Sequence, residues 1–349
     1  MKSLFLFLLA YITAPTTASL TYRGVDWSSL AVEEAAGKRF SDLDGVTKPL
    51  EKILINNGVN TVRQRLWFGA GSYDLQYNLA LAKRAHAAGL QVYLDIFFSE
   101  TWTDPGHQTT PTAWAGLGIA ALAAEIQSYT QSVMNSFQSA GVPLAMVAIG
   151  NEITEGLLWP LGKMSTSPAN VATLLHAASA GIKASSLATK PKIIIHLDNG
   201  WNWATQEWWY NSVLAAGPLK TSDFDVQGVS YYPFYNSAAT LAALKTSLGN
   251  IKAKYGKEVM VVETDWPSSC PKPAYAFPVD TKGIPWSEAG QATWIKDVAS
   301  VVQGAGGDGF FYWEPTWVDN APLGSSCAWV VMFGIDGKPF SSINVFKSI

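Results

Sequence analysis

Charged residues are scarce in this chain, and positive charge is not in excess. Only 15% of the 349 residues are charged, and 24 basic side chains stand against 27 acidic ones, giving a formal net charge of −3. A protein that binds nucleic acid needs a basic surface to neutralise phosphates. The composition therefore argues against a nucleic-acid partner.

Long apolar runs, cysteines and glycosylation sites are also few. After residue 18 every apolar run is short and interrupted by polar residues, well below the roughly 20 residues that span a bilayer. No Asn-x-Ser/Thr sequence occurs, which excludes N-glycosylation. The chain has two cysteines, Cys270 and Cys327, and a metal site normally needs more ligands than two. We therefore expect a mature chain without membrane partners.

The first 18 residues have the three parts of a secretory signal peptide. Lys2 is followed by the apolar run 4–12 and then by small residues up to Ala18. A membrane anchor is the alternative, but this run is far shorter than a membrane span. We predict a signal peptide over 1–18 and a secreted, extracellular chain over 19–349 that forms a single domain.

Export also bears on the two cysteines. An even number of cysteines in an exported chain usually means a disulfide. We predict a bond between Cys270 and Cys327 that ties together the loops after the last two strands, and two free thiols are the alternative.

Aromatic residues, in contrast, are abundant, with 15 Trp, 13 Tyr and 15 Phe. Aromatic rings stack on the C–H faces of sugars, and Trp offers the largest rigid face with a polar N–H at one edge. The alternative is that these rings fill a large core. Five tryptophans lie in segments rich in Gly, Pro, Asn or Asp that we predict to be loops, where core packing explains them less well: Trp102, Trp201, Trp203, Trp266 and Trp317.

Short β-rich runs alternate with longer segments of helical period, which is typical of parallel β/α architecture. The clearest helical face carries Leu122, Ile126, Tyr129, Val133 and Phe137. The expected helices run from about 50–57, 79–88, 122–137, 171–186, 241–255 and 288–303. The eight expected strands are 24–27, 61–67, 92–97, 145–149, 193–197, 226–231, 259–263 and 309–313.

Eight such units can form an open, doubly wound sheet or a closed (β/α)8 TIM barrel. An open dinucleotide-binding sheet would carry G-x-G-x-x-G after its first strand, and that fingerprint is missing. Polar and aromatic residues instead gather where the strands end, which is the face that carries active sites in a barrel. We predict the barrel, with these residues at its mouth: Asp26, Arg63, Arg65, Asp95, Asn151, Glu152, His196, Asp198, Tyr231, Glu263 and Trp313.

Two glutamates follow buried strands, Glu152 after the fourth and Glu263 after the seventh. Glycoside cleavage needs one carboxyl to protonate the departing oxygen and another to attack, or to activate water, on the opposite side of the sugar. A single such glutamate is more often a structural anchor. A pair on strands that face each other across a barrel favours catalysis, and Asn151 beside Glu152 suits hydrogen bonding to a sugar 2-hydroxyl.

The chain resembles a known family in these and other segments. The two glutamates occupy the places of the acid/base and the nucleophile in a large superfamily of retaining glycosidases. Further segments resemble the arabinogalactan endo-β-1,4-galactanases of glycoside hydrolase family 53, over essentially the whole mature chain: 22–26 (YRGVD), 60–67 (NTVRQRLW), 99–105 (SETWTDP), 150–152 (GNE) and 263–267 (ETDWP).

The resemblance implies cleavage of β-1,4-galactan, the side chains of pectin called type I arabinogalactan, with Glu152 as acid/base and Glu263 as nucleophile. It also implies sugar contacts by Arg63, Trp102, Asp104, Asn151, Asp198, Tyr231 and Trp313. For Arg63 the alternative is a charge pair that keeps Glu263 ionised. His196 is equally explained as a hydrogen-bonded barrel residue, and Arg65, Asp95 and Asp26 as barrel scaffolding.

Bacterial members of the family are associated with calcium in the loops after the late strands. This chain has no D-x-D-x-D-G run there and carries the two cysteines instead. We therefore expect no metal. We also expect no other cofactor, and a monomer whose partner is the polysaccharide.

The carboxylate pair alone leaves other functions open. A mannanase, a cellulase or a β-1,3-glucanase would use the same pair, and a secreted carbohydrate-binding protein could retain the groove without catalysis.

Because inward side chains of the fourth and seventh strands should lie about 5 Å apart, hydrolysis is expected to retain the anomeric configuration.

Overall fold

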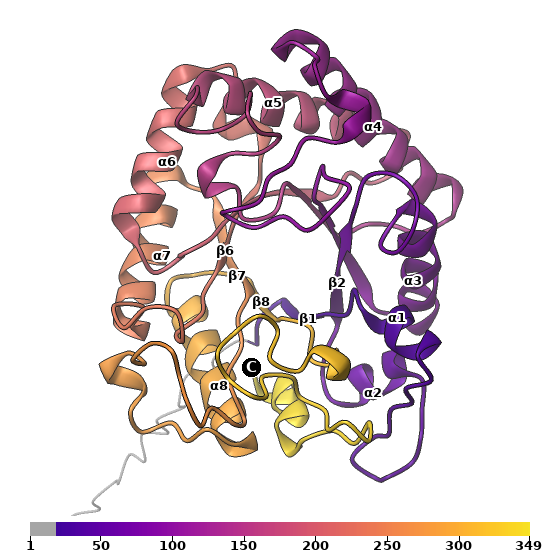
Figure 1. The fold of residues 1–349 in the computed structure, drawn as a ribbon, viewed down its shortest axis with the longest axis vertical. Coiled ribbons are helices and arrows are strands. Elements are labelled where there is room, and N and C mark those ends of the chain that lie inside the picture. Colours follow the sequence, from indigo (N-terminus) through magenta and orange to yellow (C-terminus); the bar gives the residue numbers. More distant parts are fainter. Residues whose placement is uncertain (1–18) are drawn as a thin grey trace, which may run out of the picture.

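Eight parallel strands pair in chain order, and the first pairs with the last, so the sheet closes into a barrel (Figure 1). The computed structural model describes residues 19–349, and the predicted signal peptide, 1–18, lies outside the described residues. The strands are β1 (Tyr22–Asp26), β2 (Thr61–Leu66), β3 (Gln91–Ile96), β4 (Met146–Ile149), β5 (Lys192–Leu197), β6 (Val226–Ser230), β7 (Glu258–Glu263) and β8 (Gly309–Tyr312).

This architecture confirms the predicted (β/α)8 barrel. All eight predicted strands are present, and each boundary differs from the prediction by at most two residues. The β-branched, apolar runs between polar turns were therefore a sufficient signal for the sheet.

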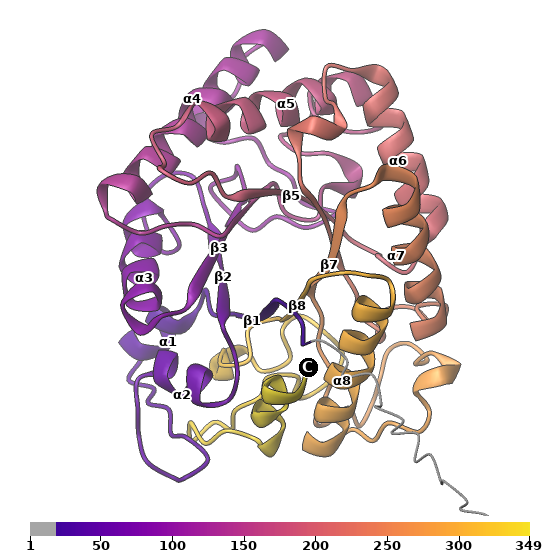
Figure 2. The same cartoon turned by 180° about the vertical axis from the view of Figure 1, so that it is seen from behind.

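Helices surround the barrel on its outside, as the view from behind also shows (Figure 2). They are α1 (Leu30–Ala35), α2 (Leu50–Asn56), α3 (Leu75–Ala88), α4 (Ile119–Ser139), α5 (Pro168–Ala184), α6 (Trp203–Ala216), α7 (Leu241–Tyr255) and α8 (Glu288–Gly304). Six of them were predicted, and α1 and α6 were not. No helix in the described part of the chain is both long and apolar enough to cross a membrane.

Helix α6 changes the interpretation of one tryptophan. Trp203 is its first residue and not part of a loop, because Asn202 caps the helix by accepting a hydrogen bond from the Thr205 amide. Bulky rings lie all around this helix, so its sequence has little helical periodicity. The pattern that revealed the other helices was therefore missing here.

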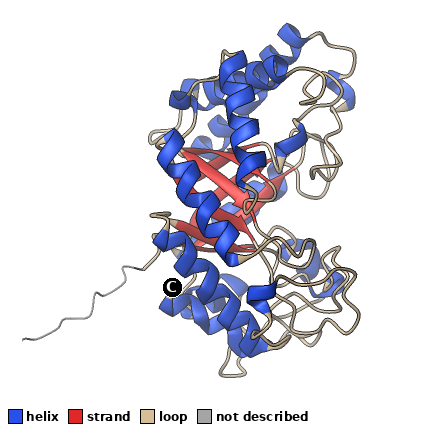
Figure 3. Ribbon diagram, turned by 90° about the vertical axis from the view of Figure 1, so that its left-hand side faces the viewer, coloured by secondary structure: helices blue, strands red, loops and turns tan. Residues whose placement is uncertain are grey.

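Side chains alternate between the two faces of each strand, which separates two packed layers. Outward residues such as Leu94 and Ile149 pack against the helices. Inward residues fill the barrel with apolar side chains, among them Tyr93, Met146 and Phe311. These side chains fill the barrel, and a pocket opens at the end where the strands finish. Most of the loops gather at that end (Figure 3).

Trp266 lies in a loop, as predicted, but its side chain belongs to the core, so core packing does explain it. Its side chain is fully buried, and its ring stacks on Trp294 with centroids 5.0 Å apart. Its indole N–H donates to the Pro285 carbonyl at 2.9 Å. The sequence of this segment is typical of a loop, but the side chain of Trp266 points into the protein.

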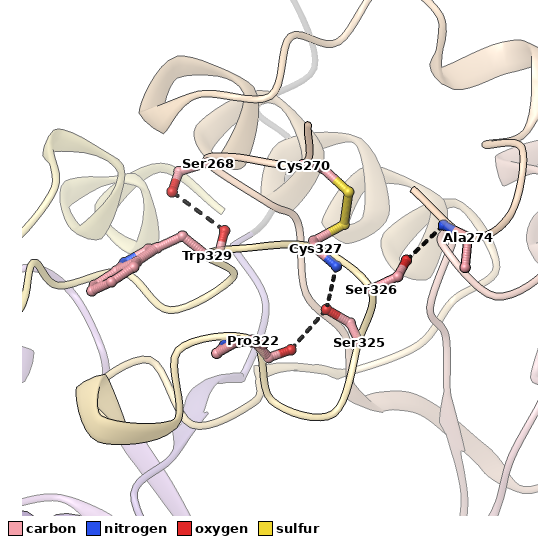
Figure 4. The surroundings of a disulfide bond; sticks show 8 residues. All are labelled: Ser268, Cys270, Ala274, Pro322, Ser325, Ser326, Cys327 and Trp329. Carbon is pink, nitrogen blue, oxygen red and sulfur yellow. Dashed lines mark hydrogen bonds between the residues drawn. A yellow bond between two sulfur atoms is a disulfide. The ribbon is translucent and has the colours of Figure 1, made fainter. Parts of the chain in front are cut away.

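The predicted disulfide between Cys270 and Cys327 is confirmed (Figure 4). Both cysteines are buried, and they join the loop between β7 and α8 to the segment after β8. Nearby, the Ala274 amide donates to the Ser326 hydroxyl at 2.9 Å, which adds a second link between the same two segments. These loops flank the open end of the barrel.

Replacement of both cysteines by serine should lower the free energy of unfolding by about 2–5 kcal/mol, because the unfolded chain loses a cross-link between residues 57 apart. Urea unfolding followed by tryptophan fluorescence measures this difference. Reduction of the unmodified protein is the control and should reproduce the lower midpoint. An equal midpoint for oxidised, reduced and double-serine protein would show that the bond contributes nothing.

Candidate active site

A pocket of about 560 Å³ opens where the strands end. Seven of the nine predicted catalytic and sugar-contacting residues line it: Trp102, Asp104, Asn151, Glu152, Asp198, Glu263 and Trp313. They come from loops or strand ends after β3, β4, β5, β7 and β8. The closed barrel thus brings together residues that are far apart in the sequence.

Glu263 reaches this pocket because β7 contains a bulge. Met260 and Val262 face the barrel interior, so regular alternation would turn Glu263 toward the helices. The pairing with β6 shifts from Val229 opposite Val261 to Ser230 opposite Glu263, which leaves one extra residue in β7. Such a bulge re-aims the following side chain.

Both carboxylate oxygens of Glu263 have hydrogen-bonding partners. The Arg63 guanidinium lies 2.6 Å from Oε1, and the Tyr232 hydroxyl donates to Oε2 at 2.8 Å. Glu263 is only 6% exposed, and the exposed part lines the pocket. Its burial and its two partners restrict the rotation of the side chain. This arrangement orients a carboxylate for attack on a bound group.

Arg63 does not line the pocket and lies beneath it, 1% exposed. Besides Glu263, it contacts Asp26 at 2.7 Å, Asp95 at 2.5 Å and the side-chain oxygen of Asn151 at 2.8 Å. These contacts favour the alternative interpretation, in which Arg63 holds Glu263 and not the sugar. Burial raises the pKa of Asp95 to about 7 despite Arg63.

The two catalytic candidates differ in their electrostatic surroundings. Burial raises the pKa of Glu152 well above its ordinary value, and the negative charges of Glu263 and Asp198 raise it further. Burial also raises the pKa of Glu263, but Arg63 and the Tyr232 hydroxyl oppose that shift. These surroundings favour the protonated form of Glu152 more than that of Glu263.

The chain turns sharply at Glu152 to place it at the barrel mouth. Gly150 has φ +116° and Glu152 itself φ +48°, a left-handed conformation that is uncommon for a residue with a side chain. Ser230 hydrogen-bonds the Glu152 carboxylate. The Ser230 hydroxyl also lies 2.8 Å from the His196 Nε2, and burial keeps the pKa of His196 well below its ordinary value.

The loop after β3 is organised by Asp104. Its carboxylate accepts hydrogen bonds from the Trp102 indole at 3.1 Å and from the Gly106 amide at 2.7 Å, and it pairs with exposed His107. The Trp102 ring meets Trp313 edge to face at 5.8 Å. Asp104 therefore positions an aromatic wall of the pocket.

Arg65 supports that wall from below. Its guanidinium forms a 2.5 Å ion pair with Glu314 and lies within 6 Å of three rings, those of Tyr73, Trp317 and Trp102. Cation–π contacts of this kind hold rings in place. Arg65 thus serves as scaffolding, one of the two roles that its sequence position left open.

Tyr231 is the second predicted sugar contact, after Arg63, that does not line the pocket. It is fully buried, its hydroxyl donates to the Ala239 carbonyl at 2.9 Å, and its ring stacks on Trp294. The next residue, Tyr232, lines the pocket and contacts Glu263. Both tyrosines follow β6 directly. The sequence does not indicate which of two adjacent side chains turns toward the pocket.

Sequence reasoning also missed Ser230 and Asp265, which line the pocket as well. Asp265 is two residues beyond Glu263, in the motif already noted, so its position was an available signal. Ser230 ends a buried strand, where a small polar residue gives no signal of its own. Among residues 19–349, no group of three or more His, Cys, Asp or Glu side chains is placed to hold a metal ion.

Glycoside hydrolysis requires two carboxyls, one that gives a proton and one that is ionised, and this aromatic-walled pocket holds two carboxyls in different electrostatic surroundings. Comparison with known proteins agrees with this chemistry. The sequence profile of glycosyl hydrolase family 53 matches residues 22–346. The chain belongs to this family.

Relatives within family 53 match along nearly the whole chain. An arabinogalactan endo-β-1,4-galactanase of Thermothelomyces thermophilus is 55% identical over 334 residues, covering 95% of this chain and all of that protein. Arabinogalactan endo-β-1,4-galactanase A of Aspergillus niger is 53% identical over 346 residues, covering 98% and 99%. A solved fungal β-1,4-galactanase is 54% identical with a TM-score of 0.92, covering 95% of this chain and all of the other.

A more distant member of family 53 shares the same fold. The catalytic domain from Ignisphaera aggregans is 28% identical, with a TM-score of 0.82, and covers 95% of this chain and 97% of that domain. As a family 53 protein, the chain is a glycoside hydrolase.

Removal of the Tyr232 hydroxyl should affect the acidic limb of the activity profile. Tyr232→Phe removes a hydrogen bond that lowers the pKa of Glu263, so ionised Glu263 is lost at a higher pH than before. The acidic limb of kcat/KM should move to higher pH, and kcat/KM at its optimum should fall about 10- to 100-fold. Initial rates across a pH series measure both effects.

Tyr231→Phe is the matched control, because that hydroxyl bonds to a backbone carbonyl outside the pocket lining. It should leave the acidic limb in place. If the two variants gave the same profile, or if only the alkaline limb moved in Tyr232→Phe, the assigned role of Tyr232 would be wrong.

Proposed function

We propose that this protein is a secreted endo-β-1,4-galactanase that cleaves the galactan side chains of pectin with retention of anomeric configuration. The observation that supports this chemistry is the arrangement of the two glutamates. Arg63 and Tyr232 fix the carboxylate of Glu263, and Glu152 lies in the same pocket with a raised pKa. The names of the relatives support the choice of galactan. The signal-like pattern over 1–18 and the disulfide support secretion.

In the first step, ionised Glu263 attacks the anomeric carbon of the sugar while Glu152 gives its proton to the departing oxygen. The C–O bond to the leaving chain breaks as the bond to Glu263 forms, which leaves a galactosyl group on the enzyme. Arg63 and Tyr232 orient the attacking carboxylate. Because burial and neighbouring negative charge keep Glu152 protonated, it can act as an acid near neutral pH.

At the start of the second step Glu263 has no negative charge, because its carboxylate is bonded to the sugar. The pKa of Glu152 then falls, because one of the negative charges that raised it is gone. Glu152 can accept a proton from water, and that water attacks the anomeric carbon and releases Glu263. Two inversions at one carbon give net retention.

Other groups in the pocket would orient the sugar. Asn151 is held by Arg63 and by its own donation to the Thr103 carbonyl at 2.8 Å, so its amide is fixed beside Glu152. Trp102 and Trp313 provide rings for stacking on a sugar face. We assign sugar contacts to these residues, to Asp198 and to Tyr232.

Hydrolysis of a panel of polysaccharides tests the substrate directly. Linear β-1,4-galactan should be degraded to a range of oligosaccharides from the first minutes, as internal cleavage requires. Mannan, cellulose and β-1,3-glucan should release no reducing sugar. Binding of galactan without any cleavage on long incubation would instead indicate a carbohydrate-binding protein.

Retention predicts the anomer of the first product. Proton NMR during early hydrolysis of galacto-oligosaccharides should show the new reducing end as the β-anomer, with the α-anomer growing later by mutarotation. A sample equilibrated for hours gives the reference ratio of anomers. If the α-anomer were formed first, direct attack by Glu263 would be excluded.

The two glutamates should respond differently to the leaving group. Glu263→Ala should abolish turnover of every substrate, because no nucleophile remains. Glu152→Ala should lose about 10²- to 10⁴-fold on galactan. On aryl galactosides with acidic leaving groups it should retain rapid release of the aryl group, because such groups depart without a proton.

A stopped-flow assay of aryl release compares the two variants on both kinds of substrate. The matched control is Glu155→Ala, which removes a nearby carboxylate that does not line the pocket. Equal losses for Glu152→Ala and Glu263→Ala on the activated substrates would contradict the assignment of roles.

A further inference from the structure

Exposed aromatic side chains are concentrated beside the pocket. Four aromatic residues are among the large apolar side chains that stand out in solvent: Trp208, Tyr235, Tyr275 and Trp286. All but Trp208 lie in the loops after β6 and β7, which are neighbouring strands and therefore open on the same end of the barrel (Figure 1). Their exposed fractions are 44% for Tyr235, 55% for Tyr275 and 41% for Trp286.

Ring contacts connect the pocket to Trp286. Tyr235 lines the pocket and packs against Phe234 with centroids 4.8 Å apart. Phe234 is followed by Phe277 at 6.4 Å, and Phe277 by Trp286 at 5.4 Å. These four residues, Tyr235, Phe234, Phe277 and Trp286, form what we call the aromatic track. Tyr235 and Trp286, its two ends, are exposed, and the buried Phe234 and the partly buried Phe277 connect them from beneath.

The outer end of the track is held rigidly. The Pro285 carbonyl, next to Trp286, accepts a hydrogen bond from the buried Trp266 indole. The Ala242 amide of α7 donates to Asp280, and the disulfide fixes the start of the same loop at Cys270. A ring that is already fixed loses little entropy when it binds a ligand. A single exposed ring needs no explanation, but several exposed rings close to one pocket are typical of a binding groove.

The charge of this loop indicates the kind of ligand. Between residues 270 and 290 it carries Lys272 and Lys282 together with Asp280 and Glu288, so it has no net charge. A surface for acidic polysaccharide would need an excess of basic residues. Exposed rings without net charge suit the C–H faces of a neutral sugar chain.

The size of the pocket supplies the reason for a second surface. A volume of about 560 Å³ is that of a site for one drug-sized molecule, whereas a polysaccharide extends far beyond it. From this continuity of rings, we propose that the aromatic track is a remote binding surface for the part of a neutral galactan chain that lies outside the pocket, with Trp286 as its outer contact. This proposal rests on the proposed galactanase activity.

The test compares long and short substrates in one enzyme. Trp286→Ala should lower the ratio of kcat/KM on long linear galactan to kcat/KM on galactotetraose by about threefold to tenfold, the range expected for one stacked ring. Trp286→Phe, which keeps a ring, should recover most of that ratio. Trp208→Ala is the matched control, since Trp208 is equally exposed but lies on α6 outside the track.

A second measurement separates binding from catalysis. In a Glu263→Ala background, which cannot turn over substrate, the added Trp286→Ala change should weaken retardation in native gels containing galactan. Failure of the unmodified enzyme to cleave galactan at all would overturn the proposed function. Normal cleavage with the same long-to-short ratio in Trp286→Ala and Trp208→Ala would overturn the aromatic track alone.

Discussion

The guanidinium of Arg63 is the interaction on which the catalytic end of the barrel depends. It contacts Asp26 from β1, Asp95 from β3, Asn151 after β4 and Glu263 from β7, so half of the strands converge on one side chain. A buried ion pair that loses one partner costs about 3–5 kcal/mol, because the remaining charge is left without water. The orientation of Glu263 therefore depends on the same contacts that hold these strands together.

Arg63 also leaves the site with more negative than positive charge. Three carboxyls surround one guanidinium, and a fourth, Glu152, lies in the same pocket. Burial, and after it this excess of negative charge, raises the pKa values of Asp95 and Glu152, while Arg63 opposes the rise at Glu263. The electrostatic difference between two chemically identical glutamates thus depends on the contact of Arg63 with Glu263.

The barrel was predictable from the sequence because each strand is a short apolar run that ends in polar residues, and this signal is local. The place of Glu263 at the barrel mouth was predictable from its position at the end of a strand. How it turns into the pocket was not, because alternation along β7 points it the other way and a bulge, which depends on pairing with β6, reverses it. The same limit explains Tyr231 and Tyr232, adjacent rings with opposite environments. Burial of Trp266 likewise depends on contacts with Trp294 and Pro285, far away in sequence.

The placement of Arg65 has a consequence for how sugar binding is distributed over the pocket. One cation lies against Tyr73, Trp317 and Trp102, and Trp102 in turn touches Trp313. A shift of any ring changes the contacts of the others through the cation that they share. Free energies for replacing these rings one at a time should therefore not be additive, since each replacement alters the support of its neighbours. The aromatic wall is thus one cooperative unit, and its stability belongs to no single tryptophan.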